Sequence, residues 1–257
     1  MQYDISGDDT QSVAISLPPG DTVIAEAGAM MYMENGIEME TRLGDGSVPD
    51  QSIWGKLWGA AKRYSMGESV FVTHFTNRSS QVAKVVFAAP YPGKIVPCDL
   101  SKRSAFLAQK DAFLCAELGT SLDIAFTRRF GAGLFGGEGF ILERIAGNGI
   151  ALIHAGGNIE KRQLAAGETL RIDTGCIAAF EETVRYDIQM VGGIMNTLFG
   201  GEGIVLATLT GPGDVLLQSL PFSRLADRLI AAAGPKRKGE GDALLGSWGR
   251  WLDGDNQ

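Results

Sequence analysis

The sequence predicts an all-β protein, and three observations support this prediction. The chain of 257 residues contains 35 glycines, and glycine enters left-handed turn conformations without steric cost. Short runs rich in valine, isoleucine and phenylalanine alternate with polar turn residues, as they do in strands. The hexapeptide LFGGEG at 134–139 recurs letter for letter at 198–203, and MGES at 66–69 is a worn third copy. We therefore expect three repeated β-sandwich units about a pseudo-threefold axis, with a few short helices.

A second landmark precedes the repeated glycine-rich segments. Leu17 and Leu164 are each followed after three residues by a glycine and an acid, and after eleven residues by another glycine. Residues 100–111 form a looser equivalent. We expect unit 1 at 1–95 with an inserted loop and an amphipathic helix, unit 2 at 96–160, unit 3 at 161–233 with a C-terminal helix, and a linker with a tryptophan-containing tail at 234–257.

Each unit is expected to continue with a β-hairpin after its glycine-rich segment. Turn residues separate two apolar runs in each unit, and Asn148-Gly149 supplies the positive φ angles of a tight turn. The paired runs are 70–75 with 82–89, 140–145 with 150–154, and 204–209 with 215–220. Apolar residues at helical spacing predict an amphipathic helix over 53–64 and a second helix over 221–233.

Composition and charge exclude several classes of function. The chain carries 30 acidic and 23 basic residues, for a net charge of -7, which disfavours a nucleic-acid surface because phosphate backbones are repelled. Three widely spaced cysteines, an odd count, favour a reducing compartment and buried thiols. The first nine residues contain acids where a signal peptide needs positive charge, and no apolar run is long enough to span a membrane. We expect a cytoplasmic protein.

The three glutamates of the glycine-rich segments are candidate site residues. Glu68, Glu138 and Glu202 could meet on the pseudo-axis and hold a cation or another small ligand, or each could cap the backbone N–H groups of its own turn. The segments lack the Lys-Ser or Lys-Thr of a phosphate-binding loop, so we interpret their glycines as structural turns.

No recognisable catalytic set is present in the sequence. His74 and His154 are too few for a metal site with several imidazole ligands, and we expect both to be core or rim residues. A nucleophile elbow is also missing. We therefore expect no catalytic residue, no metal, no cofactor and no enzymatic activity.

All four tryptophans lie in two short segments. Trp54 and Trp58 fall in the first predicted helix, and Trp248 and Trp251 in the tail. Tryptophan combines a large apolar area with one hydrogen-bond donor, so it is typical of interfaces and of the boundary between water and lipid. Three interpretations stay open: packing onto the sandwiches, contact between subunits, and contact with a membrane surface.

Three motifs in order resemble a known family. They are EAGAMMYM at 26–33, FTRRFGAGLFGGEG at 126–139 and LPFSRLA at 220–226, and the chain is similar over roughly 1–232 to bacterial relatives of the mitochondrial "altered inheritance of mitochondria" protein. The resemblance implies a fold like that of the tryptophan RNA-binding attenuation protein (TRAP-like), whose units join into rings through sheet edges. It supplies no catalytic residues, and no motif here matches that protein's RNA or tryptophan sites.

Together these observations predict a non-enzymatic β-scaffold or binding module that self-associates as a homo-oligomer. The first alternative is a peripheral membrane-associated organising protein that uses the tryptophan segments, which fits the association of the mitochondrial branch with the inner membrane. The second alternative is a metal or small-ligand site at the axial glutamates.

Overall fold

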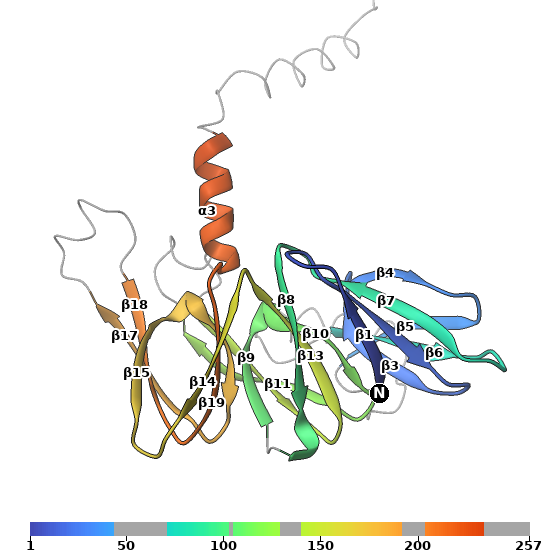
Figure 1. The fold of residues 1–257 in the computed structure, drawn as a ribbon, viewed down its shortest axis with the longest axis horizontal. Coiled ribbons are helices and arrows are strands. Elements are labelled where there is room, and N and C mark those ends of the chain that lie inside the picture. The colour runs from blue at the N-terminus through green and yellow to red at the C-terminus, as the bar shows by residue number, and fades with distance from the viewer. Residues whose placement is uncertain (44–70, 103–104, 129–139, 192–203, 234–257) are drawn as a thin grey trace, which may run out of the picture. The chain divides into compact units, whose positions relative to one another are not determined.

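The computed structural model describes residues 1–43, 71–102, 105–128, 140–191 and 204–233. In these ranges the chain forms antiparallel strands, short 3-10 turns and the helix α3 (Phe222–Ala233) (Figure 1). The predicted all-β class is therefore confirmed, and α3 confirms the helix expected at 221–233. The chain divides into a compact unit, Met1–Ser223, and a second unit, Arg224–Gln257.

The strands of the compact unit fall into three consecutive sets. The first set comprises β1 (Gln2–Ser6), β2 (Ser12–Leu17), β3 (Thr22–Glu26), β4 (Met30–Met33), β5 (Ile37–Leu43), β6 (Phe71–Asn77) and β7 (Ala83–Ala88). The second comprises β8 (Gly93–Asp99), η1 (Leu100–Lys102), β9 (Ala105–Gln109), η2 (Lys110–Ala112), β10 (Phe113–Glu117), β11 (Ser121–Arg128), β12 (Phe140–Ala146) and β13 (Ile150–Gly156). The third comprises β14 (Ile159–Leu164), β15 (Thr169–Asp173), η4 (Thr174–Cys176), β16 (Ile177–Glu181), β17 (Arg185–Val191), β18 (Ile204–Thr210) and β19 (Gly213–Gln218).

The same pairing pattern occurs in each set. In the first set β7 pairs with β2 and β4, while β6 pairs with β5 and β3. In the second, β13 pairs with β8 and β10, and β12 with β11 and β9. In the third, β19 pairs with β14 and β16, and β18 with β17 and β15. Each set thus contributes strands to two different sheets.

Two further pairings join the sets. At the first junction β3 pairs with β10, and Ala116 lies opposite Ile24. At the second junction β9 pairs with β16, and Phe180 lies opposite Leu107. The register is the same at both junctions. In each, the residue after the central pair is a glutamate, Glu117 at the end of β10 or Glu181 at the end of β16. The junctions create two six-stranded sheets, β5-β6-β3-β10-β13-β8 and β11-β12-β9-β16-β19-β14, among the described strands.

The three predicted hairpins are wrong in their pairing, although their strands exist. The strands β6 and β7 follow each other in the chain but lie in different sheets, and so do β12 with β13 and β18 with β19. The chain crosses from one sheet to the next at each turn. Gly149 has a positive φ of 149°, but positive φ serves a crossing turn as well as a hairpin turn. Turn residues alone therefore did not decide the pairing.

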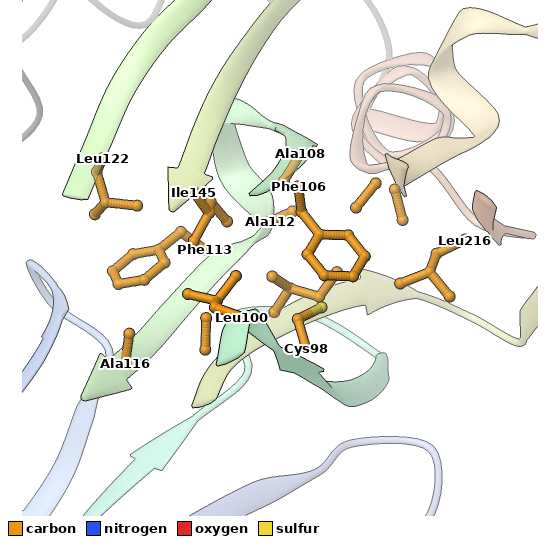
Figure 2. Packing of buried hydrophobic residues seen from close by; sticks show 14 of the residues in the cluster. Cys98, Leu100, Phe106, Ala108, Ala112, Phe113, Ala116, Leu122, Ile145 and Leu216 are labelled. Carbon is orange, nitrogen blue, oxygen red and sulfur yellow. The ribbon is translucent and has the colours of Figure 1, made fainter. Parts of the chain in front are cut away.

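The hydrophobic core consists of three clusters that exchange side chains across the junctions. Ile24 of β3 belongs to the central cluster, and Leu107 of β9 belongs to the third cluster (the central cluster is shown in Figure 2). Side chains also pass in the opposite direction. Among them are Leu114 and Cys115 of β10 in the first cluster, and Ala178 and Ala179 of β16 in the central cluster. We call these six the crossing residues; all are at most 5% exposed.

The predicted leucine landmarks occupy equivalent turns. Gly20 and Gly167 have positive φ angles of 85° and 79°. The N–H of Gly20 donates to the carbonyl of Asn77, the last residue of β6, and that of Gly167 donates to the carbonyl of Gly211, which follows β18. The predicted unit boundaries at 95/96 and 160/161 fall inside β8 and β14, because the sets begin with these strands. The amphipathic helix expected at 53–64 and the linker and tail at 234–257 lie outside the described residues.

Candidate functional sites

The predicted site residues all lie outside the described residues. This holds for Glu68, Glu138 and Glu202 and for Trp54, Trp58, Trp248 and Trp251. The segments that contain the three glutamates each connect two paired antiparallel strands, β5 to β6, β11 to β12 and β17 to β18. Their equivalent places in the chain agree with the repeat, while the question of whether they meet stays a prediction.

A different repeated glutamate does occur in the described part of the chain. Glu34, Glu117 and Glu181 follow or end equivalent strands, and each carboxylate accepts a backbone N–H from the start of the last strand in its set. The donors are Lys84 at 2.7 Å, Ile150 at 3.1 Å and Asp214 at 2.8 Å. These glutamates satisfy the backbone of a sheet-crossing turn, which is a structural role.

Sequence reasoning missed these glutamates because their neighbours differ from unit to unit. A positional signal was available, since Glu34, Glu117 and Glu181 each lie 17 positions after Leu17, Leu100 and Leu164. In the second set the close approach of glutamate and backbone also requires a glycine. A Cβ on Gly149 would collide with the Glu117 carboxylate.

Acidic side chains gather at the first junction. Glu26 ends β3, Asp111 lies in η2, and Glu143 lies in β12, where it is 4% exposed. Burial, followed by the charge of Asp111, raises the pKa of Glu26 to about 7, and Lys110 opposes this rise. Burial, followed by the charges of Glu26 and Asp111, raises the pKa of Glu143 to about 8. We call Glu26, Asp111 and Glu143 the acidic cluster; two of its members exchange protons near neutral pH.

Two rings border the acidic cluster. Burial, together with the charges of Asp111 and Glu26, raises the pKa of Tyr91 to about 12, and its ring centroid lies 4.4 Å from that of His154. Burial lowers the pKa of His154 to about 4, so this imidazole is neutral at physiological pH. His154 is 1% exposed and His74 is 4% exposed, so the expectation that both histidines are core residues is right.

The acidic cluster can take up and release protons near neutral pH, because the pKa values of Glu26 and Glu143 are raised. Within the ranges that the structure describes, no three His, Cys, Asp or Glu side chains are arranged to hold a metal ion. Cys98 and Cys115 are buried, as expected, whereas Cys176 is only half-buried, contrary to the expectation for all three thiols. Burial raises the pKa of the Cys115 thiol. Because the thiolate is the reactive form, Cys115 is not an activated nucleophile.

The second junction places amides where the first has ionisable groups. By strand register Gln109 corresponds to Glu26, and Gln218 corresponds to His154. Gln218 donates to the Gln109 side chain at 2.8 Å and to the Gly175 carbonyl at 2.9 Å, and it accepts the N–H of Gly156 at 2.9 Å. The amide network is neutral, and Gln218 is 4% exposed.

An open hollow of about 510 Å³ lies in the third set of strands. It is lined by Gln163, Leu164, Ala165, Glu181, Thr183, Pro212 and Gly213. The acid in this lining, Glu181, already accepts the N–H of Asp214. The acid of this lining is therefore already used by the fold.

The strands β4 and β15 each have an open edge, meaning one side without a pairing strand in the described part of the chain. On β4 the exposed fractions are 63% for Met31, 51% for Tyr32 and 38% for Met33. The equivalent residues at the two junctions, 114–116 and 178–180, are at most 1% exposed. An exposed apolar edge strand of this kind is a template for pairing with another strand.

Among the described residues, no helix has the length and apolar character needed to cross a bilayer.

Comparison with known proteins gives matches that extend over all three sets of strands. The family model for mitochondrial biogenesis AIM24 matches residues 3–220. An uncharacterised protein of Streptococcus pyogenes serotype M6 is 31% identical over 220 residues, which are 84% of this chain and 84% of the relative. The crystal structure of a Streptococcus pyogenes protein is similar with a TM-score of 0.69 and 27% identity, covering 89% of this chain and 97% of that chain.

Proposed function

We propose that this chain, which belongs to the mitochondrial biogenesis AIM24 family, is a non-enzymatic β-scaffold that associates with further copies of itself. One observation carries the proposal. The residues of β4 are 38–63% exposed at 31–33, whereas their equivalents in β10 and β16 are buried by a neighbouring strand. Burying this surface against another copy gains hydrophobic free energy and pairs the unpaired backbone groups of the edge.

The proposal includes the finer architecture expected from the sequence. The repeated pairing pattern and the shared register of the two junctions support three TRAP-like β-sandwich units, with units 1 to 3 beginning at β1, β8 and β14. A pseudo-threefold axis within one chain would require β4 to pair with β15 of the same chain. Because such closure would cover the β4 edge, it is the alternative to self-association through β4; it stays a prediction, as does a cytoplasmic location.

The test of self-association is the molar mass in solution across a range of concentrations. Wild type is expected to exceed the 27.3 kDa of one chain, and Met31→Lys/Met33→Lys is expected to dissociate to it. Val82→Lys is a matched control, because Val82 is 59% exposed in a turn before β7. Circular dichroism verifies folding. A monomeric wild type, or equal dissociation of the control, would overturn the proposal.

The helix α3 supports one alternative function. Its Leu229 and Ile230 are 61% and 70% exposed, and Arg228 lies beside them in the sequence. A helix of this kind can bind a membrane surface. Co-sedimentation with anionic vesicles tests the alternative, using Leu229→Glu/Ile230→Glu and Trp54→Ala/Trp58→Ala. Undiminished binding of both variants, or no binding by wild type, would contradict it.

A metal or small-ligand site at Glu68, Glu138 and Glu202 is the remaining alternative. Metal analysis after saturation with divalent ions tests it, with Glu138→Gln/Glu202→Gln as the comparison. Equal metal content in both proteins would count against the site.

A further inference from the structure

The ionisable side chains that border the first junction have uncharged equivalents at the second. By strand register the equivalent pairs are Glu26 with Gln109, Lys110 with Thr174, Asp111 with Gly175, Glu143 with Ala207, and His154 with Gln218. None of the second members changes its charge with pH in the physiological range. One backbone geometry is therefore built twice, once with titratable groups at these positions and once without them.

The two glutamates border the side chains that join the first set to the second. Alternate residues of a strand lie on the same face, so Glu143 shares its face of β12 with Ile145, and Glu26 shares its face of β3 with Ile24. Ile145 packs in the central cluster with Ala116 of β10 (Figure 2), and Ile24 enters the same cluster. A charge on either glutamate thus forms beside the apolar contact between the sets.

Charged and titratable groups reach this pair from every element packed against it. Besides burial, the charges of Glu26 and Asp111 repel the Glu143 carboxylate, whereas Lys110 attracts it. The further groups are Tyr91 before β8, His154 of β13 and, on the sheet face of Glu26, His74 of β6 and Glu40 of β5. When the three carboxyl groups of the acidic cluster are ionised, their negative charges outnumber the charge of Lys110.

We infer that the first junction is a pH-controlled joint: when Glu26 and Glu143 lose their protons, β3 separates from β10, while the pairing of β9 with β16 persists. Separation takes Glu26 away from Glu143 and lets water reach both carboxylates. It therefore relieves the repulsion and the loss of hydration that ionisation causes in the closed junction. The opened chain exposes the crossing residues Leu114 and Cys115, which the first set otherwise covers.

The direction and the pH range of the opening follow from the two glutamates. Their pKa values in the folded chain, about 7 for Glu26 and about 8 for Glu143, lie above the ordinary value of 4.5. Their contribution to closing is complete below pH 4.5 and is lost as the pH rises through 7 and 8. The imidazole of His154, with a pKa of about 4, titrates below this range. The joint is closed in mildly acidic solution and opens in mildly alkaline solution.

Thiol labelling compares the opening of the two junctions in the full chain. Cys115 lies opposite Ala25 of β3 and is 0% exposed, so iodoacetamide reaches it only when the strands separate. The matched reporter is Ala179→Cys, because Ala179 is the equivalent residue at the second junction and is also 0% exposed. Each protein keeps one reporter thiol. The other cysteines are removed by Cys98→Ala, Cys176→Ser and, for the second reporter, Cys115→Ala.

The corrected labelling rates decide the inference. Each rate is divided by that of the urea-unfolded protein at the same pH, because the reactivity of a thiol itself rises with pH. From pH 6 to pH 9 the corrected rate at Cys115 is expected to rise at least about tenfold more than that of the Ala179→Cys reporter. An equal rise at both reporters, no rise at Cys115, or loss of the strand signal in circular dichroism at pH 9 would overturn it.

Two further variants assign the opening to the glutamates. Glu26→Gln installs the residue type that the second junction has at Gln109, and Glu143→Gln removes the buried acid. Each should reduce the pH-dependent rise at Cys115 by about tenfold, whereas Glu160→Gln, at an exposed position of β14, should leave it unchanged. Because Glu26 is only half-buried, its variant tests the inference even if Glu143→Gln does not fold. An undiminished rise in Glu26→Gln would contradict the joint.

Discussion

The first and second junctions share one backbone geometry but differ in the polar groups around it. Both use the same antiparallel register and both exchange core side chains. The first is bordered by the acidic cluster and His154, whereas the second has the amide network of Gln218 and the ion pair between Arg144 and Glu182. The comparison teaches that backbone pairing and the exchange of apolar side chains define a junction. The polar side chains that surround it, here called the polar border, set how its stability depends on pH.

The crossing residues are expected to give the largest effect. Ile24→Ala and Leu107→Ala each remove a buried side chain from a neighbouring core and should lower the free energy of unfolding by about 2–5 kcal/mol. Urea unfolding measures both. Val82→Ala, at an exposed position, should change it by less than about 0.5 kcal/mol. If only one of the two substitutions lowered the free energy of unfolding, the polar border and not the exchange of apolar side chains would account for the stability of the junctions.

Glu143→Gln should sharpen the contrast through its pH dependence. The folded-state pKa of Glu143 is about 8, above its ordinary value of 4.5, so its stabilising contribution is complete below pH 4.5 and is lost as the pH rises through 8. Relative to wild type, the variant should gain roughly 2–3 kcal/mol between pH 6 and pH 9. Glu160→Gln, on exposed β14, should show no such gain. Thermal unfolding across this pH range provides the check. A stability difference between variant and wild type that does not change with pH would contradict the raised pKa of Glu143.

Leucine substitutions at the equivalent positions 218 and 154 should affect stability differently. Gln218→Leu leaves the Gly156 N–H and the Gln109 side chain without their bonds, which should cost about 1–3 kcal/mol. His154→Leu should be neutral or stabilising, since its imidazole is buried and neutral. Its advantage should grow as the pH falls from 6.5 towards 4, where wild type must charge this ring. Denaturant midpoints at pH 7 and pH 5 compare them, and a large loss for His154→Leu at both would contradict this.

The ion pair of the second junction should matter least. Arg144 donates to Glu182 at 2.7 Å and 3.0 Å, and this contact raises the pKa of Arg144 and lowers that of Glu182. Both side chains are more than a third exposed, so the coupling energy in a double-mutant cycle should be below about 1 kcal/mol. High salt should reduce it further. A larger coupling energy would show that the polar border contributes substantially to the stability of the second junction.

The strands and the repeat could be predicted from sequence, but their pairing could not. The apolar runs of β6, β7, β12 and β13 were found because burial on a sheet imposes a residue pattern. The turns between them were interpreted as hairpin turns, although glycine and asparagine serve sheet-crossing turns equally well. Which strands pair depends on contacts between residues far apart in the chain, and local patterns do not contain that information.

The sites were harder to predict than the fold, for a related reason. Letter-for-letter identity drew attention to Glu138 and Glu202, whereas Glu34, Glu117 and Glu181 share a role without sharing neighbours. The acidic cluster brings residues from β3, η2 and β12 together across a junction. Nothing in the sequence near Glu26 or Glu143 marks the first as half-buried or the second as buried, because the residues that cover them are distant along the chain.

The exchange of core side chains also restricts how a chain of this kind can change its length. Cutting within β8–β13 would leave Ile24 or Leu107 without the core that receives it. Removing or duplicating the whole stretch would instead join equivalent faces, since β3 and β9 accept the same kind of partner. A shorter or longer relative built by this rule would still present β4 at one end and β15 at the other. Length would then change only in whole steps, while the two ends, and any contact made by them, stay the same.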